Sequence, residues 1–183
     1  MRLRHSITTL LVAAATFQGM AQSECAEYWR SASRSSDARF KVNGQSASAS
    51  LQVGVPTELN IIIYKGQDYR ISTVYDEKVL GDHLVIRIVE KVRGPKKRPA
   101  SSVKVDGEKP EFEDVRKVIW DNQEHEMADE VEFTATSTKR IAIEITAPGA
   151  PENPKDAKRG RPQPDIGCIG ILIEHMPTPT IGF

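Results

Sequence analysis

Apolar and polar residues alternate with a period of two over several stretches of the chain. In the stretch 59–63, Leu59, Ile61 and Ile63 fall on one face, and in 141–145 three isoleucines do the same. This alternation predicts half-buried β-strands, and the many β-branched residues in these stretches favour the same structure. The predicted strands cover residues 59–63, 69–75, 84–89, 130–135, 140–145 and 169–173, with weaker ones at 46–53 and 115–121.

About eight strands without convincing helical periodicity predict an all-β fold. Their polar outer faces fit two antiparallel sheets packed face to face, so we expect a jelly-roll-like sandwich. One short helix is expected near the N-terminus, over about residues 25–33. The chain is long enough for one such domain, which we place at residues 22–183.

Eight of the eleven prolines fall in two charged stretches, residues 94–110 and 148–165. Proline removes ladder hydrogen bonds and charge opposes burial, so both stretches are predicted to be surface loops. Residues 93–104 carry five Lys or Arg and no acid. Such a run can contact anionic lipid or polysaccharide by charge, or remain a solvated loop.

The first 21 residues predict an exported protein. Arg2 and Arg4 precede an apolar run over residues 7–17, and small residues follow at 19–21. This order is typical of a cleaved signal peptide, here 1–21, and the run is too short for a spanning helix. No later apolar run reaches 18 residues, so no transmembrane segment is expected after cleavage. The predicted location is the periplasm, the cell surface or the medium.

Export also changes the interpretation of the two cysteines. Thiols tend to pair in an oxidising compartment, so a Cys25–Cys168 disulfide is predicted, with two separate buried thiols as the alternative. The bridge would close a loop of over 140 residues and stabilise the fold by about 4–5 kcal/mol in the chain-entropy model.

Composition and motifs argue against several classes of function. Twenty-five basic residues balance 25 acidic ones, which is atypical of a nucleic-acid-binding protein. The Gly-x-Ser-x-Gly and His-Glu-x-x-His motifs of hydrolases and zinc peptidases are absent. No catalytic residue is therefore predicted, and the protein is expected not to be an enzyme.

Calcium is the one cofactor that the sequence leaves open. Loops of β-sandwiches can hold Ca²⁺ with oxygen ligands, and acidic residues gather after two predicted strands. Turn chemistry is the alternative, because Asp and Asn bond their own backbone in turns. The candidate ligands are Asp121, Asn122 and Glu124 after one strand, and Asp76 and Asp82 around another.

Glycan binding would require an exposed aromatic platform. The candidates are Tyr28 and Trp29 near Cys25, and Trp120 at the end of a predicted strand. The alternative is that Trp120 lies in the core and that the N-terminal pair covers one end of the sandwich beside the disulfide.

Three segments resemble a family of exported proteins of the Bacteroidota that has no assigned activity. They are LNIIIYKGQDYRI at 59–71, VIWDN at 118–122 and the ending GCIGILIEHMPTPTIGF at 167–183. The resemblance implies export and no particular chemistry.

A second resemblance is to the jelly-roll domains appended to secreted peptidases, the bacterial pre-peptidase C-terminal type. Gly-x-Asp-Tyr-x-Ile at 66–71 is followed by Trp-Asp-Asn at 120–122, Glu-Phe-Thr-Ala at 132–135 and Lys-Arg-Ile-Ala-Ile-Glu-Ile at 139–145. This resemblance implies a sandwich similar to carbohydrate- or calcium-binding modules. Export without a catalytic motif leads us to expect a non-enzymatic envelope protein that acts as a binding or structural module. The sequence does not identify its partner, and an envelope protein and a glycan are both open. The alternatives are a glycan-binding module assisted by calcium and a glycan-active enzyme.

Overall fold

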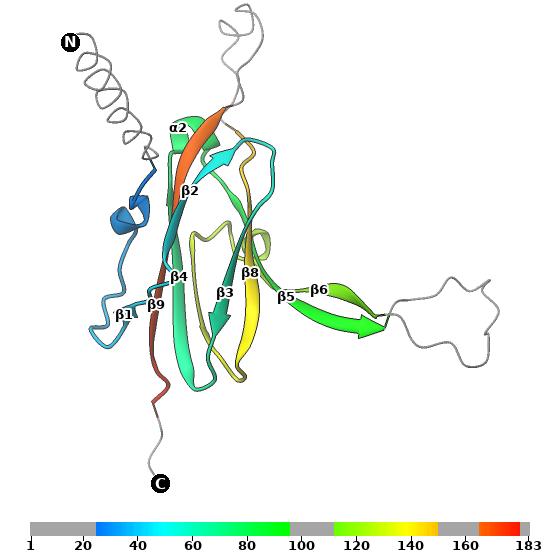
Figure 1. Cartoon of the computed structure of the whole chain (residues 1–183). Coiled ribbons are helices and arrows are strands. Elements are labelled where there is room, and N and C mark those ends of the chain that lie inside the picture. The colour runs from blue at the N-terminus through cyan, green and yellow to red at the C-terminus, as the bar shows by residue number, and fades with distance from the viewer. Residues whose placement is uncertain (1–24, 96–111, 150–164, 180–183) are drawn as a thin grey trace, which may run out of the picture.

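The computed structural model describes residues 25–95, 112–149 and 165–179 (Figure 1). Two antiparallel sheets pack face to face, so the predicted all-β sandwich is confirmed. The predicted signal peptide and most of the two proline-rich stretches lie outside the described residues.

The first sheet, sheet A, is built around the long strand β9 (Ile166–Pro177). On one side β9 pairs with β2 (Ala47–Gln52) and with the two-residue strand β1 (Lys41–Val42). On its other side β9 pairs with β4 (Gln67–Tyr75), and β4 pairs with β7 (Glu130–Thr134). Strand β7 therefore forms one edge of sheet A.

The second sheet, sheet B, has the order β3-β8-β5-β6. Its strands are β3 (Thr57–Ile63), β8 (Lys139–Thr146), β5 (Val85–Pro95) and β6 (Phe112–Asp121). Apart from β1, sheet A has the order β2-β9-β4-β7. At each position of this order, the strand of sheet A is adjacent in the chain to the strand at the same position of sheet B: β2 to β3, β9 to β8, β4 to β5 and β7 to β6. This arrangement of eight strands is a jelly roll, as the sequence predicted.

The core between the sheets comes from the alternation that predicted the strands. Ile61, Ile143 and Ile173 are at most 1% exposed, and they come from β3, β8 and β9 respectively. Tyr69 is also buried, and its ring stacks with Phe133 on β7 and with His175 on β9. Tyr69 therefore belongs to the core.

The helical content is smaller and differently placed than the sequence predicted. In place of a helix over 25–33, the N-terminal segment contains a short 3-10 turn, η2 (Tyr28–Ser31). A single α-helical turn, α2 (Glu77–Leu80), and a 3-10 turn, η3 (Asn122–Glu124), lie elsewhere in the chain. Both begin at an aspartate whose carboxylate caps a backbone amide, a local signal that is too short to produce periodicity.

The predicted disulfide is present. Cys25 and Cys168 are bonded across 143 residues of sequence, and their Cα atoms lie 5.1 Å apart. Cys168 lies near the start of β9, which is an interior strand of sheet A. The bond therefore ties the N-terminal segment to the middle of this sheet.

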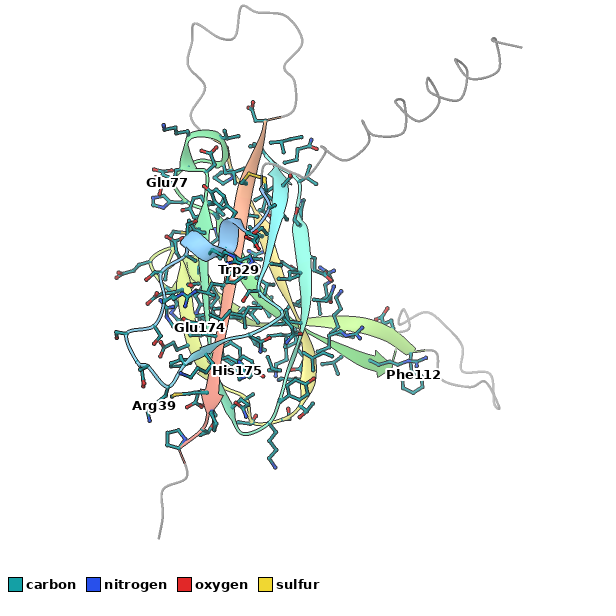
Figure 2. All side chains as sticks on the ribbon, turned by 60° about the vertical axis from the view of Figure 1, so that its left-hand side comes forward. Trp29, Arg39, Glu77, Phe112, Glu174 and His175 are labelled. Atoms are coloured by element: carbon teal, nitrogen blue, oxygen red, sulfur yellow. A yellow bond between two sulfur atoms is a disulfide. The ribbon has the colours of Figure 1, made fainter. Side chains whose placement is uncertain are left out.

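Residues 25–40, which we call the N-terminal clasp, cover the outer face of sheet A (Figure 2). A side chain at Gly170 of β9 would collide with the backbone of Trp29, so the clasp lies directly on the strand. Farther along, the clasp covers a buried ion pair between Arg70 and Glu174, whose Nη1 and Oε2 atoms are 2.8 Å apart. The Ser33 carbonyl accepts a hydrogen bond from Arg70, and the Ser35 amide donates one to Glu174.

Strands β5 and β6 extend beyond the sandwich as a two-stranded ribbon (Figure 1). The predicted loop over 94–110 is wrong at its start, because Gly94 and Pro95 still pair with Glu113 and Phe112. The predicted strands at 84–89 and 115–121 were correspondingly too short. Among the described residues, no helix is long and apolar enough to cross a membrane.

Candidate functional site

Strand β7 presents an unpaired edge of sheet A. The Ala135 amide donates to the Gln67 carbonyl, and the Thr73 amide donates to the Asp129 carbonyl, at the two ends of the β7–β4 ladder. Inward and outward backbone groups alternate along an antiparallel ladder. The amide and carbonyl groups of Glu130, Glu132 and Thr134 therefore point away from β4. In the described part of the chain, no strand lies beyond them.

The edge strand β3 of sheet B is protected in a way that β7 is not. The side chain of Gln45 accepts a hydrogen bond from the Ile62 amide and donates one to the Ile62 carbonyl. One residue thus satisfies the outward backbone groups of Ile62, near the end of β3. Unprotected strand edges are templates for pairing with another chain, so the difference makes β7 the edge of interest.

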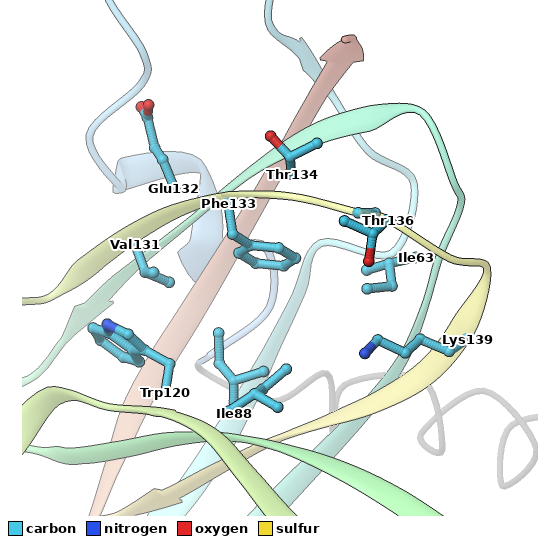
Figure 3. A pocket seen from close by; sticks show the side chains of 11 residues that line it. Ile63, Ile88, Trp120, Val131, Glu132, Phe133, Thr134, Thr136 and Lys139 are labelled. Atoms are coloured by element: carbon cyan, nitrogen blue, oxygen red, sulfur yellow. The ribbon is translucent and has the colours of Figure 1, made fainter.

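An apolar cleft lies between the sheets beside the β7 edge (Figure 3). Its volume is about 250 Å³, which is enough for several side chains. Val131 and Phe133 point into it from β7, and Ile88 and Trp120 face them from sheet B. Glu132 and Thr134 point the opposite way, toward the outer face of sheet A. The cleft is therefore an open end of the core.

The cleft exists because sheet B bends away at this point. The pairing of β5 with β6 shifts register between Ile88 and Val89, which leaves Ile119 as an extra residue on β6. Such a bulge increases the local twist and bends the strands. Beyond this bulge, β5 and β6 leave the sandwich as the ribbon (Figure 1). The side of the cleft opposite β7 is therefore not closed by a further strand of sheet B in the described part of the chain.

Charged groups surround this apolar opening. At one end, the Lys139 ammonium and the Glu90 carboxylate form an ion pair of 2.8 Å. The stretch 124–132, which leads into β7, contains five acidic residues and no Lys or Arg. Glu130 and Glu132 remain more than half exposed, although both contact the Arg70 guanidinium. The surface next to the unpaired edge is consequently acidic.

The residues predicted as calcium ligands occupy two loops that do meet at one end of the sandwich. Asn122 joins these loops, because its buried side-chain amide donates to the Leu84 carbonyl and accepts from the Ile86 amide. The acidic side chains of the same loops do not converge. Asp76 caps α2 through the Lys78 amide, and Asp82 and Glu124 are exposed.

Asp121 is engaged by an arginine. Burial of its carboxylate opposes ionisation, but hydrogen bonds from the Arg87 guanidinium and the Gln123 amide outweigh it and lower the pKa of Asp121. Among the described residues, no group of three or more His, Cys, Asp or Glu side chains is arranged to hold a metal ion. These contacts match the turn chemistry that was the alternative to calcium.

The tyrosine beside this loop end is a hydrogen-bond donor. The Tyr75 hydroxyl donates to the Asp82 carbonyl, with 2.9 Å between the oxygens. Burial, followed by the nearby negative charge of Asp129, raises the pKa of Tyr75 to about 12. The phenol therefore stays neutral at physiological pH.

Both tryptophans proposed for glycan binding have a neighbouring side chain over one face of the ring. Trp120 stacks on His125, with 5.6 Å between the ring centroids. The Trp120 side chain also lines the apolar cleft. Trp29 has the Arg30 guanidinium over its ring. Tyr28 and Trp29 lie against β9 on the outer face of sheet A, beside the disulfide. Glycan binding by these residues stays a prediction.

The sequence did not identify the β7 edge or the cleft. Alternation correctly placed Val131 and Phe133 on the core side, but it carries no information on which strands become edges. The only available signal was the acidic run 124–132 beside an otherwise ordinary strand.

No family model matches the chain, and no curated protein matches it. Neither resemblance stated from the sequence gains support from these comparisons. Functional inference therefore depends on the geometry of the site.

Proposed function

We propose that this protein is an exported binding module that receives an extended polypeptide strand along β7. The observation that carries the proposal is the unpaired edge at Glu130, Glu132 and Thr134, which runs beside an apolar cleft. A strand that adds to a sheet edge gains affinity from main-chain hydrogen bonds and specificity from pockets for alternate side chains. Both elements lie side by side at β7.

The Cys25–Cys168 disulfide supports the exported part of the proposal, because such bonds persist in oxidising compartments. The sequence features of residues 1–21 support it as well. Binding without catalysis remains the interpretation that the motifs favour.

The site also indicates which strand would bind. Side chains of an added strand alternate between the cleft and the outer face of sheet A. The cleft side is lined by Val131 and Phe133, and the outer side carries Glu130 and Glu132. The preferred ligand is therefore a strand in which apolar residues alternate with basic ones.

The test uses a short peptide that alternates valine and lysine, capped at both ends and labelled with a fluorophore. We expect it to bind, as measured by fluorescence anisotropy. A peptide of the same composition with its valines and lysines in separate blocks should bind much more weakly. Equal binding of both peptides would show that charge attraction alone explains the binding, and it would contradict the proposal.

The matched pair of protein variants is Thr134→Pro and Thr134→Ala. Proline at 134 removes an amide that points away from β4, so the internal ladder stays intact while pairing with a ligand is blocked. Alanine removes the same hydroxyl contact with Asp68 but keeps the amide. Peptide binding should be lost in Thr134→Pro and retained in Thr134→Ala. Retention in both variants would place the ligand elsewhere.

A further inference from the structure

The ribbon that leaves sheet B carries apolar side chains that the described part of the chain does not cover. We call residues 91–95 and 112–118 the arm. Its Val92, Val115 and Val118 are 42%, 44% and 52% exposed. Phe112 lies at its far end, below the guanidinium of Arg93 (Figure 2). A two-stranded ribbon is marginally stable in water without a third strand or a covered face.

The arm also has an unpaired edge of its own. Strand β8 accompanies β5 only as far as Glu90, so residues 91–95 pair with β6 alone. The stretch has five residues, the same length as β7. Within one molecule the arm points away from the sandwich (Figure 1), so this edge does not meet β7 of the same copy.

We propose that residues 91–95 of one copy pair with β7 of a second copy, so that the protein assembles with itself through its arm. This proposal rests on the proposed function and names the strand that β7 receives. Val92 would then face the cleft beside Phe133. Lys91 and Arg93, which point to the other face of the strand, would lie over Glu130 and Glu132, and Lys91 would then exchange its ion pair with Glu58 for one at the β7 edge.

Charge supports a second copy as the occupant. The unpaired edge of the arm, residues 91–95, carries Lys91 and Arg93 and no acid. The acidic run 124–132, which has five acids and no Lys or Arg, extends into the receiving edge. Opposite potentials on two surfaces of one molecule favour contact between different copies in this orientation and disfavour contact between like surfaces.

The interface joins two different surfaces, the arm of one copy and the β7 edge of another. Two copies can exchange arms reciprocally, or contacts can continue from copy to copy. In both arrangements, a molecule with a defective arm still has an intact edge, and a molecule with a defective edge still has an intact arm. This property gives the proposal a specific test.

The experiment measures mass in solution by analytical ultracentrifugation of residues 22–183 over a range of protein concentrations. Wild-type protein should self-associate, and high salt should weaken the association. Val92→Glu, in the arm, and Thr134→Pro, in the edge, should each be monomeric. An equimolar mixture of the two variants should form a one-to-one complex, because one intact contact remains.

The controls are Thr134→Ala and Ile62→Glu, both of which should associate as the wild type does. Ile62 has an exposure of 37%, close to that of Val92, but lies on the protected edge β3. Loss of association in Ile62→Glu would attribute the effect to general surface hydrophobicity and overturn the proposal. If Thr134→Pro does not fold, competition replaces it: the alternating valine–lysine peptide should dissociate the wild-type assembly.

The outcomes separate this proposal from the proposed function. If the wild type is monomeric at all concentrations but binds the peptide, the function stands and self-assembly is wrong. If the protein neither associates nor binds the peptide, both are wrong. Association that survives Val92→Glu would show that the arm is not the strand that β7 receives.

Discussion

The N-terminal clasp and the arm are both additions to the eight-stranded sandwich, and they are held in opposite ways. The clasp contains one 3-10 turn and otherwise irregular backbone, but a disulfide and buried polar contacts attach it to sheet A. The arm is a regular ribbon with ladder hydrogen bonds, and its apolar side chains are exposed. Regular secondary structure and attachment to the core are therefore separate properties in this molecule.

The clasp and the arm also differ in how far an arginine is buried, under the clasp in one case and on the arm in the other. Arg70 contacts Glu130, Glu132 and Glu174 with a side-chain exposure of 5%. Arg116, on the arm, contacts Glu58 and Glu144 with an exposure of 56%. The two arginines thus have similar numbers of carboxylate partners, but the Arg70 side chain is buried and the Arg116 side chain is exposed to water. We therefore expect the clasp to determine stability, whereas the arm determines association.

The largest effect on stability should come from removing the disulfide. Replacing Cys25 and Cys168 by serine should lower the free energy of unfolding by about 5 kcal/mol, because the bond restricts the unfolded chain over 143 residues. Urea unfolding of the variant and of the wild type measures the difference. Reduction of the wild type should produce a similar loss. A change close to zero would mean that the clasp is held by its polar contacts alone.

The second effect concerns the buried ion pair under the clasp. Arg70→Met should cost about 3–5 kcal/mol, because it leaves the buried Glu174 carboxylate without its partner. Urea unfolding at neutral pH is again the measurement.

The control for this pair is the double variant Arg70→Met/Glu174→Leu. It removes both charges, so it should cost less than Arg70→Met alone, although the Ser35 amide then loses its acceptor. A double variant that is as unstable as the sum of the two single variants would show that the two side chains act independently.

The parts of the fold that the sequence predicted are those that local alternation determines. The spacing of Ile61 and Ile63, or of Ile141, Ile143 and Ile145, places each residue on the core face whatever lies beyond it. The disulfide was predicted because only two cysteines exist and export favours their pairing. The alternation led to the predicted jelly-roll-like sandwich, and the disulfide was a separate prediction.

The parts that the sequence did not predict depend on contacts between distant segments. Alternation places Arg70 and Glu174 on an outer face, and only the clasp, attached from more than 30 residues away along the chain, buries them. The basic and proline residues near 94 favoured a loop, because local sequence does not show that β6 pairs with them. The β7 edge and its cleft depend on the strand order of both sheets, so no local pattern could predict the candidate site.

The smallest effect should come from Arg116→Ala on the arm. Exposed ion pairs contribute little, since water solvates the separated charges well, so we expect a loss of about 0.5–1 kcal/mol in the free energy of unfolding. Glu58 keeps a second cationic partner in Lys91, whose hydrogen bond lowers the pKa of Glu58, so this carboxylate is not left unpaired. The loss should shrink in high salt, where exposed charges are screened. Arg116→Lys, which keeps the charge, should lie between the alanine variant and the wild type. If Arg116→Ala instead cost as much as Arg70→Met, the arm would be anchored as firmly as the clasp. The exposed valines of the arm would then need an explanation other than a partner strand.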